Sequence, residues 1–305
     1  MSISSGSQHS VFYIPEVTYG TTPATPTWTP FPHNSYAVGM TKDSIVSNKL
    51  RDDRQIEDFR HGNKQMAGDI GFDLEFGSFD DILEAVMCGT WATDVLKAGT
   101  TRRSFTIERK FSDIATPEWH RTVGSEFDSL SVSVAPNQMV SCTASVMGKD
   151  LAIATSEVTS STYSADPTNQ PFDSFTGSIQ EGGSTIAIVT ALDLNLQNSL
   201  ATTHSIGSDL TNRPSIGQSN LTGSLTSYFE SKALYEKFIN ETSSSIVLVL
   251  TDPAGNDLEF DIPNLKYSSG NPDVSDAGTV TISLDFQALY SVSDASQLVI
   301  TRTAA

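Results

Sequence analysis

The chain has 305 residues, which is enough for one large or two ordinary domains. Its 36 acidic and 18 basic residues give a formal net charge of −18, which argues against a protein that grips nucleic-acid phosphates, although the acidity could serve only solubility. The sequence shows neither an apolar run of membrane-spanning length nor an N-terminal secretory signal, so we expect neither a membrane span nor secretion.

Residues 1–37 are expected to form an N-terminal arm. The stretch TYGTTPATPTWTPFPHN places four prolines among threonines, a composition that disfavours helix and central strand. Disorder would be one interpretation, but the segment has too many aromatic residues for a free tail: Phe12, Tyr13, Tyr19, Trp28 and Phe31. We therefore expect an arm ordered against another surface, such as a neighbouring subunit.

Residues 51–64 carry four basic and four acidic residues and no apolar face. This composition predicts a long exposed loop, and loops of that length inside compact domains usually have a function. A solvated hairpin tip would show the same composition, so both interpretations remain open at this point.

A strand followed by one short helix is predicted between residues 68 and 91. Apolar residues alternate with polar or small ones, as in a strand with one buried face, at Ile70, Phe72, Leu74 and Phe76. Ser78 is suited to cap the following helix, and Gly89 is suited to end it. Apolar residues then recur at helical spacing, at Phe79, Ile82, Leu83, Val86 and Met87.

The rest of the chain is dominated by short alternating strands. Before the middle of the sequence they are predicted at residues 104–109, 130–134 and 139–146. Residues 152–176 are rich in Ser, Thr and Pro and are predicted to be a linker. Beyond it we predict a second helix near residues 234–239 and strands at residues 192–197, 220–229, 246–251, 258–262 and 279–289.

The segments before and after the linker share order and spacing, which we interpret as an internal duplication rather than a chance likeness of β patterns. Matching residues lie 150 to 152 positions apart through loop, strand and helix, and 140 apart at the long final strand. The matches are Asn48–Asn198, Leu50–Leu200, Ile70–Leu221, Leu74–Leu225, Ile82–Leu234, Glu84–Glu236, Val86–Phe238 and Val140–Val280. We predict a mainly β fold of two tandem antiparallel β-sandwich or barrel domains, residues 38–151 and 177–305, each with one flanking α-helix.

Catalytic and metal-binding motifs are missing from the sequence. The histidines His9, His33, His61, His120 and His204 are scattered and lack the spacing of metal ligands. No GxSxG, Walker or dinucleotide-binding motif is present, and the clustered carboxylates of residues 51–64 alternate with arginines. Cys88 and Cys142 are expected to be reduced and buried. We therefore expect no catalytic residues, no metal, no cofactor and no enzymatic activity.

Several passages resemble tail tube proteins, also called major tail proteins, of long flexible-tailed bacteriophages (siphophages). In the first half these are EVTYGTTPATPTW, GDIGFDLEFGSFDDILEAVMCGTW and SFTIERKFSDI. In the second half they are GSIQEGGSTIAIVTALDLNLQNSL, LTGSLTSYFESKALYEKFINET and GTVTISLDFQALYS. The likeness spans almost the whole chain.

This resemblance implies a structural protein of the virion tail tube, assembled in the host cytoplasm. Rings of such proteins stack helically into a hollow tube that conducts the DNA genome to the host at infection, without specific DNA binding and without a membrane. The implied partners are other copies of the chain, a tape-measure protein, and the tail terminator and distal tail proteins. Single-domain members form hexameric rings, so a duplicated chain would close a pseudo-hexameric ring of three copies, with a hexamer as the alternative.

In such a ring we expect polar strand residues to face the lumen, although an outward face is equally compatible with the pattern. The lumen candidates are Asp73, Glu75, Asp193, Asn195, Gln197, Thr222, Ser224 and Thr226. Mixed charges could set the register between stacked rings, and the candidates are Arg51, Asp52, Asp53, Arg54, Glu57, Asp58, Arg60 and Lys64, whereas the second-half equivalent, residues 201–219, is nearly uncharged. The helix residues expected between domains are Phe79, Ile82, Leu83, Val86, Leu234, Tyr235 and Phe238.

The alternative function is a β-sandwich adhesin or carbohydrate-binding module. Such a module would present an aromatic platform in a groove, and the lack of a secretory signal argues against it.

Overall fold

The structure is a computed structural model that describes residues 3–186, 188–274 and 278–305. Close to half of these residues lie in β-strands, and the described chain has two short α-helices and one short 3-10 helix, Gly6–Gln8. The prediction of a mainly β fold with two helices is confirmed. None of the helices in the described ranges is both long enough and apolar enough to cross a membrane.

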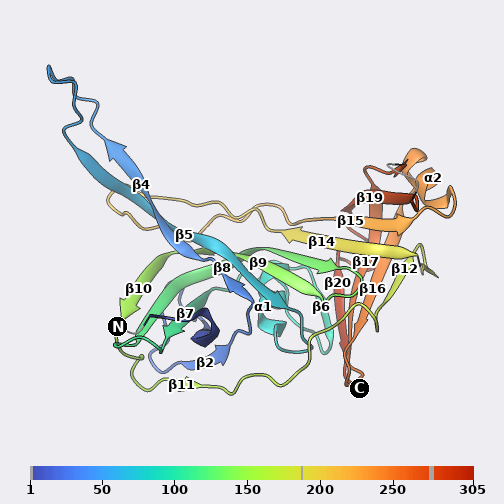
Figure 1. Cartoon of the computed structure of the whole chain (residues 1–305), viewed down its shortest axis with the longest axis horizontal. Coiled ribbons are helices and arrows are strands. Elements are labelled where there is room, and N and C mark those ends of the chain that lie inside the picture. The colour runs from blue at the N-terminus through green and yellow to red at the C-terminus, as the bar shows by residue number, and fades with distance from the viewer. Residues whose placement is uncertain (1–2, 187, 275–277) are drawn as a thin grey trace.

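The first half of the chain contains helix α1 (Asp80–Met87) and the first eleven strands. The strands are β1 (His9–Pro15), β2 (Thr27–Pro30), β3 (Ser35–Tyr36), β4 (Gly39–Val46), β5 (Phe59–Asp73), β6 (Val95–Lys97), β7 (Phe105–Phe111), β8 (Glu118–Val134), β9 (Ser141–Gly148), β10 (Asp150–Ala154) and β11 (Thr162–Tyr163). Figure 1 shows most of them gathered on one side of the molecule, with β6 beside the strands of the second half.

The second half contains helix α2 (Ala233–Ile239) and the remaining strands (Figure 1). The strands are β12 (Ser178–Glu181), β13 (Ser184–Thr185), β14 (Val189–Gln197), β15 (Asn220–Tyr228), β16 (Ser244–Thr251), β17 (Asp257–Tyr267), β18 (Asn271–Asp273), β19 (Thr281–Ala288) and β20 (Val299–Thr303). Among the described strands, only β2 and β11 pair in parallel.

The two halves repeat one pattern of strand pairing. In the first half the antiparallel order is β1–β7–β8–β9–β5, with β3 and β4 beyond β5. In the second half it is β12–β16–β17–β19–β15–β14. Strand β10 pairs with β8 as β20 pairs with β17. The shared pairing supports the duplication inferred from the sequence.

A shared bulge fixes which residues correspond. The β7–β8 register shifts between Phe105 and Ile107, opposite Ser125 and Thr122. The β16–β17 register shifts in the same way between Ser244 and Ile246, opposite Leu265 and Ile262. A bulge breaks the ladder at one defined place, so its recurrence matches β8 with β17 and β9 with β19 at 140 positions apart, as the Val140–Val280 match predicts.

The predicted match between β5 and β15 is wrong by four residues. Ile70 lies opposite Ala144, and the counterpart of Ala144 is Leu284, which lies opposite Leu225. Ile70 therefore corresponds to Leu225, not to Leu221. Both strands alternate apolar and polar residues, so a shift of four keeps every side chain on its expected face, and the sequence pattern cannot detect it.

The halves do not form two separate sheets. Strand β14 pairs antiparallel with the end of β8, from Leu192 opposite Val134 to Gln197 opposite Ser129. This β8–β14 junction joins the strands of both halves into one continuous sheet, in which β5, β9, β8, β14, β15 and β19 lie side by side (Figure 1). The two predicted tandem sandwich or barrel domains are therefore not clearly separate, because one fused central sheet runs through both halves.

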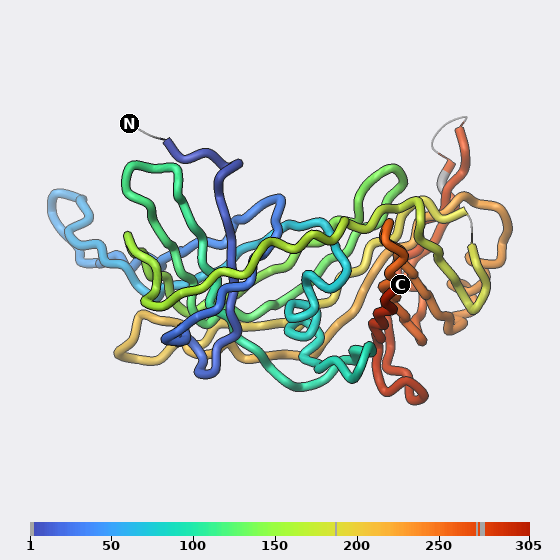
Figure 2. Tube along the Cα trace, turned by 90° about the horizontal axis from the view of Figure 1, so that it is seen from below, coloured from blue at the N-terminus to red at the C-terminus, as the bar shows by residue number. Residues whose placement is uncertain are grey.

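The N-terminal arm and the linker pack on their own chain. Strand β1 pairs with β7 along its whole length, and Trp28 and Phe31 are at most 1% exposed. In the linker, Phe172 is fully buried, and its backbone N–H donates to Leu74 O at 2.8 Å. Figure 2 shows this segment running along the molecule from one half to the other. The N-terminal arm is therefore ordered by its own chain, without the expected packing against a neighbouring subunit.

The boundaries of α1 differ from those predicted. Phe79, not Ser78, precedes the first helical residue, and the Ser78 hydroxyl instead donates to Glu75 Oε2 at 2.8 Å. The helix ends at Cys88, which adopts a left-handed conformation with φ of 46°, one residue before the predicted Gly89. Both differences are one-residue shifts at helix ends, where local patterns specify position least.

Residues 51–64 are not entirely a loop, because residues 59–64 belong to β5 and pair with β4. Together β4 and the start of β5 form a hairpin that projects from the body of the molecule (Figure 1). The hairpin-tip interpretation therefore holds for residues 51–58.

Candidate functional site: the polar face of the central sheet

One face of the central sheet is polar because its strands alternate small polar or acidic residues with apolar ones. The register aligns these residues in rows across six strands. One row is Asp73, Ser141, Ser133, Asp193, Ser224 and Asp285, and the next is Gly71, Thr143, Ser131, Asn195, Thr222 and Gln287. A third row is Asp69, Ser145, Ser129, Gln197 and Asn220. We call these three rows the polar face.

The opposite face of the same strands is the hydrophobic core. Its main row is Phe72, Cys142, Val132, Leu194, Gly223 and Phe286. The five side chains in this row are at most 4% exposed. Gly223 is required there, because a Cβ atom would lie 2.4 Å from Phe286 Cζ. The core therefore holds the sheet in one register and leaves the polar face open.

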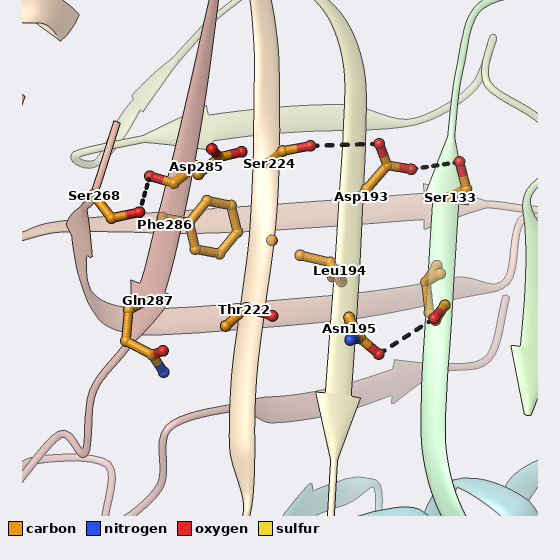
Figure 3. A pocket seen from close by; sticks show the side chains of 13 residues that line it. Ser133, Asp193, Leu194, Asn195, Thr222, Ser224, Ser268, Asp285, Phe286 and Gln287 are labelled. Atoms are coloured by element: carbon orange, nitrogen blue, oxygen red, sulfur yellow. Dashed lines mark hydrogen bonds between the residues drawn. The ribbon is translucent and has the colours of Figure 1, made fainter. Parts of the chain in front are cut away.

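Hydrogen bonds between strands fix the acidic side chains of the polar face. Ser133 Oγ donates to Asp193 Oδ1 at 2.6 Å across the β8–β14 junction, and Ser145 Oγ donates to Asp69 Oδ1 at 2.8 Å. Figure 3 shows Ser224 approaching Asp193 from the other side, at 3.5 Å. Hydroxyl groups rather than cations thus hold these carboxylates, and their negative charges are not cancelled locally.

The charge of the polar face is negative only. Its carboxylates are Asp69, Asp73, Asp193 and Asp285, and no Lys or Arg stands in the three rows. A lysine occurs at the flank, where Lys266 of β17 lies opposite Gln287. Phosphate oxygens are held mainly by cationic side chains and backbone N–H groups, so this face offers little to bind a nucleic-acid backbone.

The face is hollowed but does not resemble a sugar-binding groove or a metal site. A shallow hollow of about 620 Å³ lies over β8, β14, β15 and β19 (Figure 3). Its single aromatic lining residue among the described residues is Phe286, which is 2% exposed and so offers no platform. No group of three or more His, Cys, Asp or Glu side chains in the described ranges is arranged to hold a metal ion.

Seven of the eight predicted lumen residues lie on polar-facing positions of the central sheet. They are Asp73, Asp193, Asn195, Gln197, Thr222, Ser224 and Thr226. The eighth, Glu75, lies beyond the end of β5, where it is half-buried and burial raises the pKa of its carboxyl group. The contributions of β8 and β9 were not predicted, although Ser and Thr alternate with apolar residues at residues 129–133 and 141–145 of the sequence.

The central sheet ends in edges that carry no further strand among the described residues. At one end β3 and β4 pair only with β5. At the other end β18 pairs only with β19, and Val274 beside it is 70% exposed. Their counterparts, β14 and the end of β8, pair with each other inside the chain. Unpaired edges of this kind are templates for strand addition.

The predicted ring-stacking residues lie on the projecting hairpin and are exposed or partly exposed. Arg51 pairs with Asp53 at 2.8 Å, and this hydrogen bond lowers the pKa of the Asp53 carboxyl group. Arg60 pairs with Asp58 at 3.2 Å. Lys64 instead pairs with Asp209 of the second half at 2.9 Å. Asp52, Arg54 and Glu57 complete the set at the hairpin tip.

The two helices differ in their burial. Phe79 and the α1 residues Ile82, Leu83 and Val86 are at most 3% exposed. Leu234, Tyr235 and Phe238 of α2 are only half-buried, and no residue of α2 is buried. The position of these residues between domains stays a prediction, and α2 has an apolar side that its own chain leaves partly open.

Comparison with known proteins gives one family. The family model described as "Phage tail tube protein" matches residues 6–288. Among solved structures, the chain is similar to the tube-terminating cap of the anti-feeding prophage, with a TM-score of 0.34 and 14% identity, covering 47% of this chain and 97% of that one. A search of curated proteins finds no match.

The family match spans more than half of the chain and agrees with the passages that carry the sequence resemblance. Tail tube proteins are structural, non-enzymatic proteins that assemble as oligomeric rings in the virion tail. The chain therefore belongs to the phage tail tube protein family and is a structural component of a phage tail.

Proposed function

We propose that three copies of this chain close a pseudo-hexameric ring whose polar faces line a central channel. Rings would stack helically into the tube that conducts the DNA genome to the host. The observation that carries the proposal is the β8–β14 junction, because the two strand edges that correspond to it are unpaired in the described chain.

The junction supplies a template for contact between copies. Leu192 lies opposite Leu225 as Tyr36 lies opposite Ile70, so Tyr36 corresponds to Leu192. Ser131 lies opposite Thr143 as Asn271 lies opposite Ser283, so Asn271 corresponds to Ser131. Three residues further along the chain from each, Val274 therefore corresponds to Val134. Since Leu192 pairs with Val134, the proposal pairs Tyr36 of one copy with Val274 of the next. Each contact would continue the central sheet, and closure would remove its edges.

The chemistry of the polar face supports a channel wall. Hydroxyl, amide and carboxylate groups keep the wall hydrated, and the absence of cations from its rows avoids strong attachment of phosphates. In this role DNA passes without sequence-specific contact. The family function further suggests a tape-measure protein inside the growing tube and terminator and distal tail proteins at its ends.

Electron microscopy of concentrated protein and native mass measurement of isolated rings test the proposal. We expect a ring with the mass of three 32.8 kDa chains. Six chains would favour the hexamer alternative, and a monomer that never assembles would contradict the proposal.

The variant Val274→Asp probes the edge itself. Its side chain is 70% exposed, so folding should be unaffected, while a charge placed against Tyr36 should raise the concentration needed for assembly by about tenfold or more. Val292→Asp, at a position 87% exposed and outside the proposed edge, is the matched control. Wild-type assembly by Val274→Asp would exclude this edge.

A further inference from the structure

Two corresponding segments of the chain adopt different conformations. Residues 42–64 form the outer part of the β4–β5 hairpin with its tip, and residues 198–219 connect β14 to β15. We call residues 42–64 the arm, which is distinct from the N-terminal arm of residues 1–37, and we call residues 198–219 the folded-back loop. They are almost equal in length, and a glycine stands at the same place in both, Gly62 and Gly217. The bridge between Ala201 and Ser215 corresponds to the pairing of Ile45 with Arg60.

The folded-back loop lies on the first half of its own chain. Asn198, 3% exposed, donates from Nδ2 to Val86 O at the end of α1 at 2.8 Å. Arg213 donates from Nε to Glu126 Oε1 at 2.7 Å, and Thr211 Oγ1 donates to Lys64 O at 3.0 Å. These contacts bury the base of the loop and cover the end of α1.

The arm has no comparable surface to lie on. It projects into solvent (Figures 1 and 2), and its ion pairs apart from Lys64–Asp209 join residues of the arm itself, among the described residues. It also exposes apolar side chains: Leu50 is 97% exposed, Ile56 74% and Phe59 54%. The folded-back loop shows that a segment of this kind can pack onto one half of the molecule when that half lies beside it.

The second half carries a site equivalent to the one that receives the folded-back loop, with opposite charges. Lys266 stands where Glu126 stands, because Lys266 lies opposite Gln287 as Glu126 lies opposite Met147. Arg102 also pairs with Glu126 and donates to Pro214 O of the folded-back loop. Its counterpart is Glu241, counted back from the matched Ser244 and Phe105. Lys266 is exposed and forms no ion pair with the described residues.

The charge of the arm is inverted at the matching position. Counted from the match between β5 and β15, Asp58 corresponds to Arg213. The ion pair Arg213–Glu126 inside the chain therefore has the counterpart Asp58–Lys266, with both signs exchanged. Within the single chain Asp58 and Lys266 do not form this ion pair, since Asp58 contacts Arg60 instead.

We propose that the arm of one copy lies across the second half of the neighbouring copy in the same ring, with Asp58 paired to Lys266 of the second copy. The contact repeats between chains what the folded-back loop does within one chain, and it covers the open end of α2. This inference rests on the proposed ring. We call the contact between the arm of one copy and the second half of the next copy the clasp. The inverted charges also discriminate between the two sites. Asp58 of the arm is repelled by Glu126, which belongs to the site that the folded-back loop fills.

Charge exchange tests the clasp. Lys266→Glu and Asp58→Lys should each raise the concentration for ring assembly by about tenfold, because each places like charges together. The double variant Asp58→Lys/Lys266→Glu should restore assembly. Asp166→Lys makes the same charge change at an exposed position of the linker, outside the arm, and is the control, with an expected change of less than about threefold. Equal effects of all single variants, or no rescue, would overturn the clasp.

Cross-linking separates this inference from the proposed function. In Asp58→Cys/Lys266→Cys protein, a short bis-maleimide should join copies within isolated rings that have not stacked. The native Cys88 and Cys142, 6% and 2% exposed, should not compete. Rings that assemble normally but cross-link only after stacking would assign the arm to ring stacking and overturn the clasp. Wild-type protein that forms no rings would instead contradict the proposed function.

Discussion

Helices α1 and α2 occupy equivalent places in the two halves, yet one is buried and the other is not. Five residues of α1 are buried, and none of α2. The cover of α1 comes partly from the second half, since Asn198 contacts its end and Arg302 of β20 pairs with Asp80. The difference shows that the first half is completed by its own chain, whereas the second half lacks the equivalent neighbour.

The largest expected contrast is between Ile82→Ala and Leu234→Ala. Ile82 is fully buried, so its truncation should lower the free energy of unfolding by about 4 kcal/mol. Leu234 is half-buried in the single chain, so its truncation should cost about 1 kcal/mol. Urea denaturation of the isolated chain measures both. Equal losses would mean that α2 is as well packed as α1.

Helix α2 is held by a polar network instead. Lys237 Nζ contacts both carboxylate oxygens of Glu181 at 2.6 Å, and the Tyr267 hydroxyl donates to the same carboxylate at 3.0 Å. Lys237→Met should lower the free energy of unfolding by about 3 kcal/mol, because Glu181, 5% exposed, would remain charged without its partner.

Thermal unfolding of Lys237→Met and of Lys237→Met/Glu181→Gln checks this expectation. The double variant removes the uncompensated charge and should recover part of the loss. No difference between the two variants would show that the charge of Glu181 is not what Lys237 balances.

A histidine chain should make the first half the more acid-sensitive of the two. Arg109 Nε donates to His9 Nε2 at 3.0 Å, His9 Nδ1 donates to His33 Nε2 at 2.9 Å, and His33 Nδ1 donates to Phe31 O at 3.1 Å. Burial, with the nearby charge of Arg109 adding to it, lowers the pKa of His9 from 6.5 to about 4. The neutral form is therefore the folded form.

Between pH 6.5 and about 4 the unfolded chain binds a proton at His9 that the folded chain does not, so stability should fall as the pH falls through this range. The expected loss is about 1 kcal/mol, after allowing for the partial exposure of the ring. His9→Gln should remove this part of the pH dependence, measured as the difference in unfolding free energy between wild type and variant. An unchanged profile would contradict the assignment.

The sequence by itself determined which segments alternate, where the helices occur and which motifs are absent. Alternation at Ile70, Phe72 and Leu74 depends only on neighbours in the chain, so the strand and its two faces were predictable. The same local pattern placed seven lumen candidates on one face of the sheet. Order and spacing also revealed the repeat, and the ordered passages carried the family resemblance.

Only the tertiary structure decided how the halves meet. The match of Ile70 to Leu225, the pairing of β8 with β14 and the burial of Phe172 depend on contacts between residues far apart in the chain. The arm and the folded-back loop make the same point, because equivalent segments adopt different conformations according to the surface beside them. A period of two specifies faces but not register, and register is set by packing across the sheet.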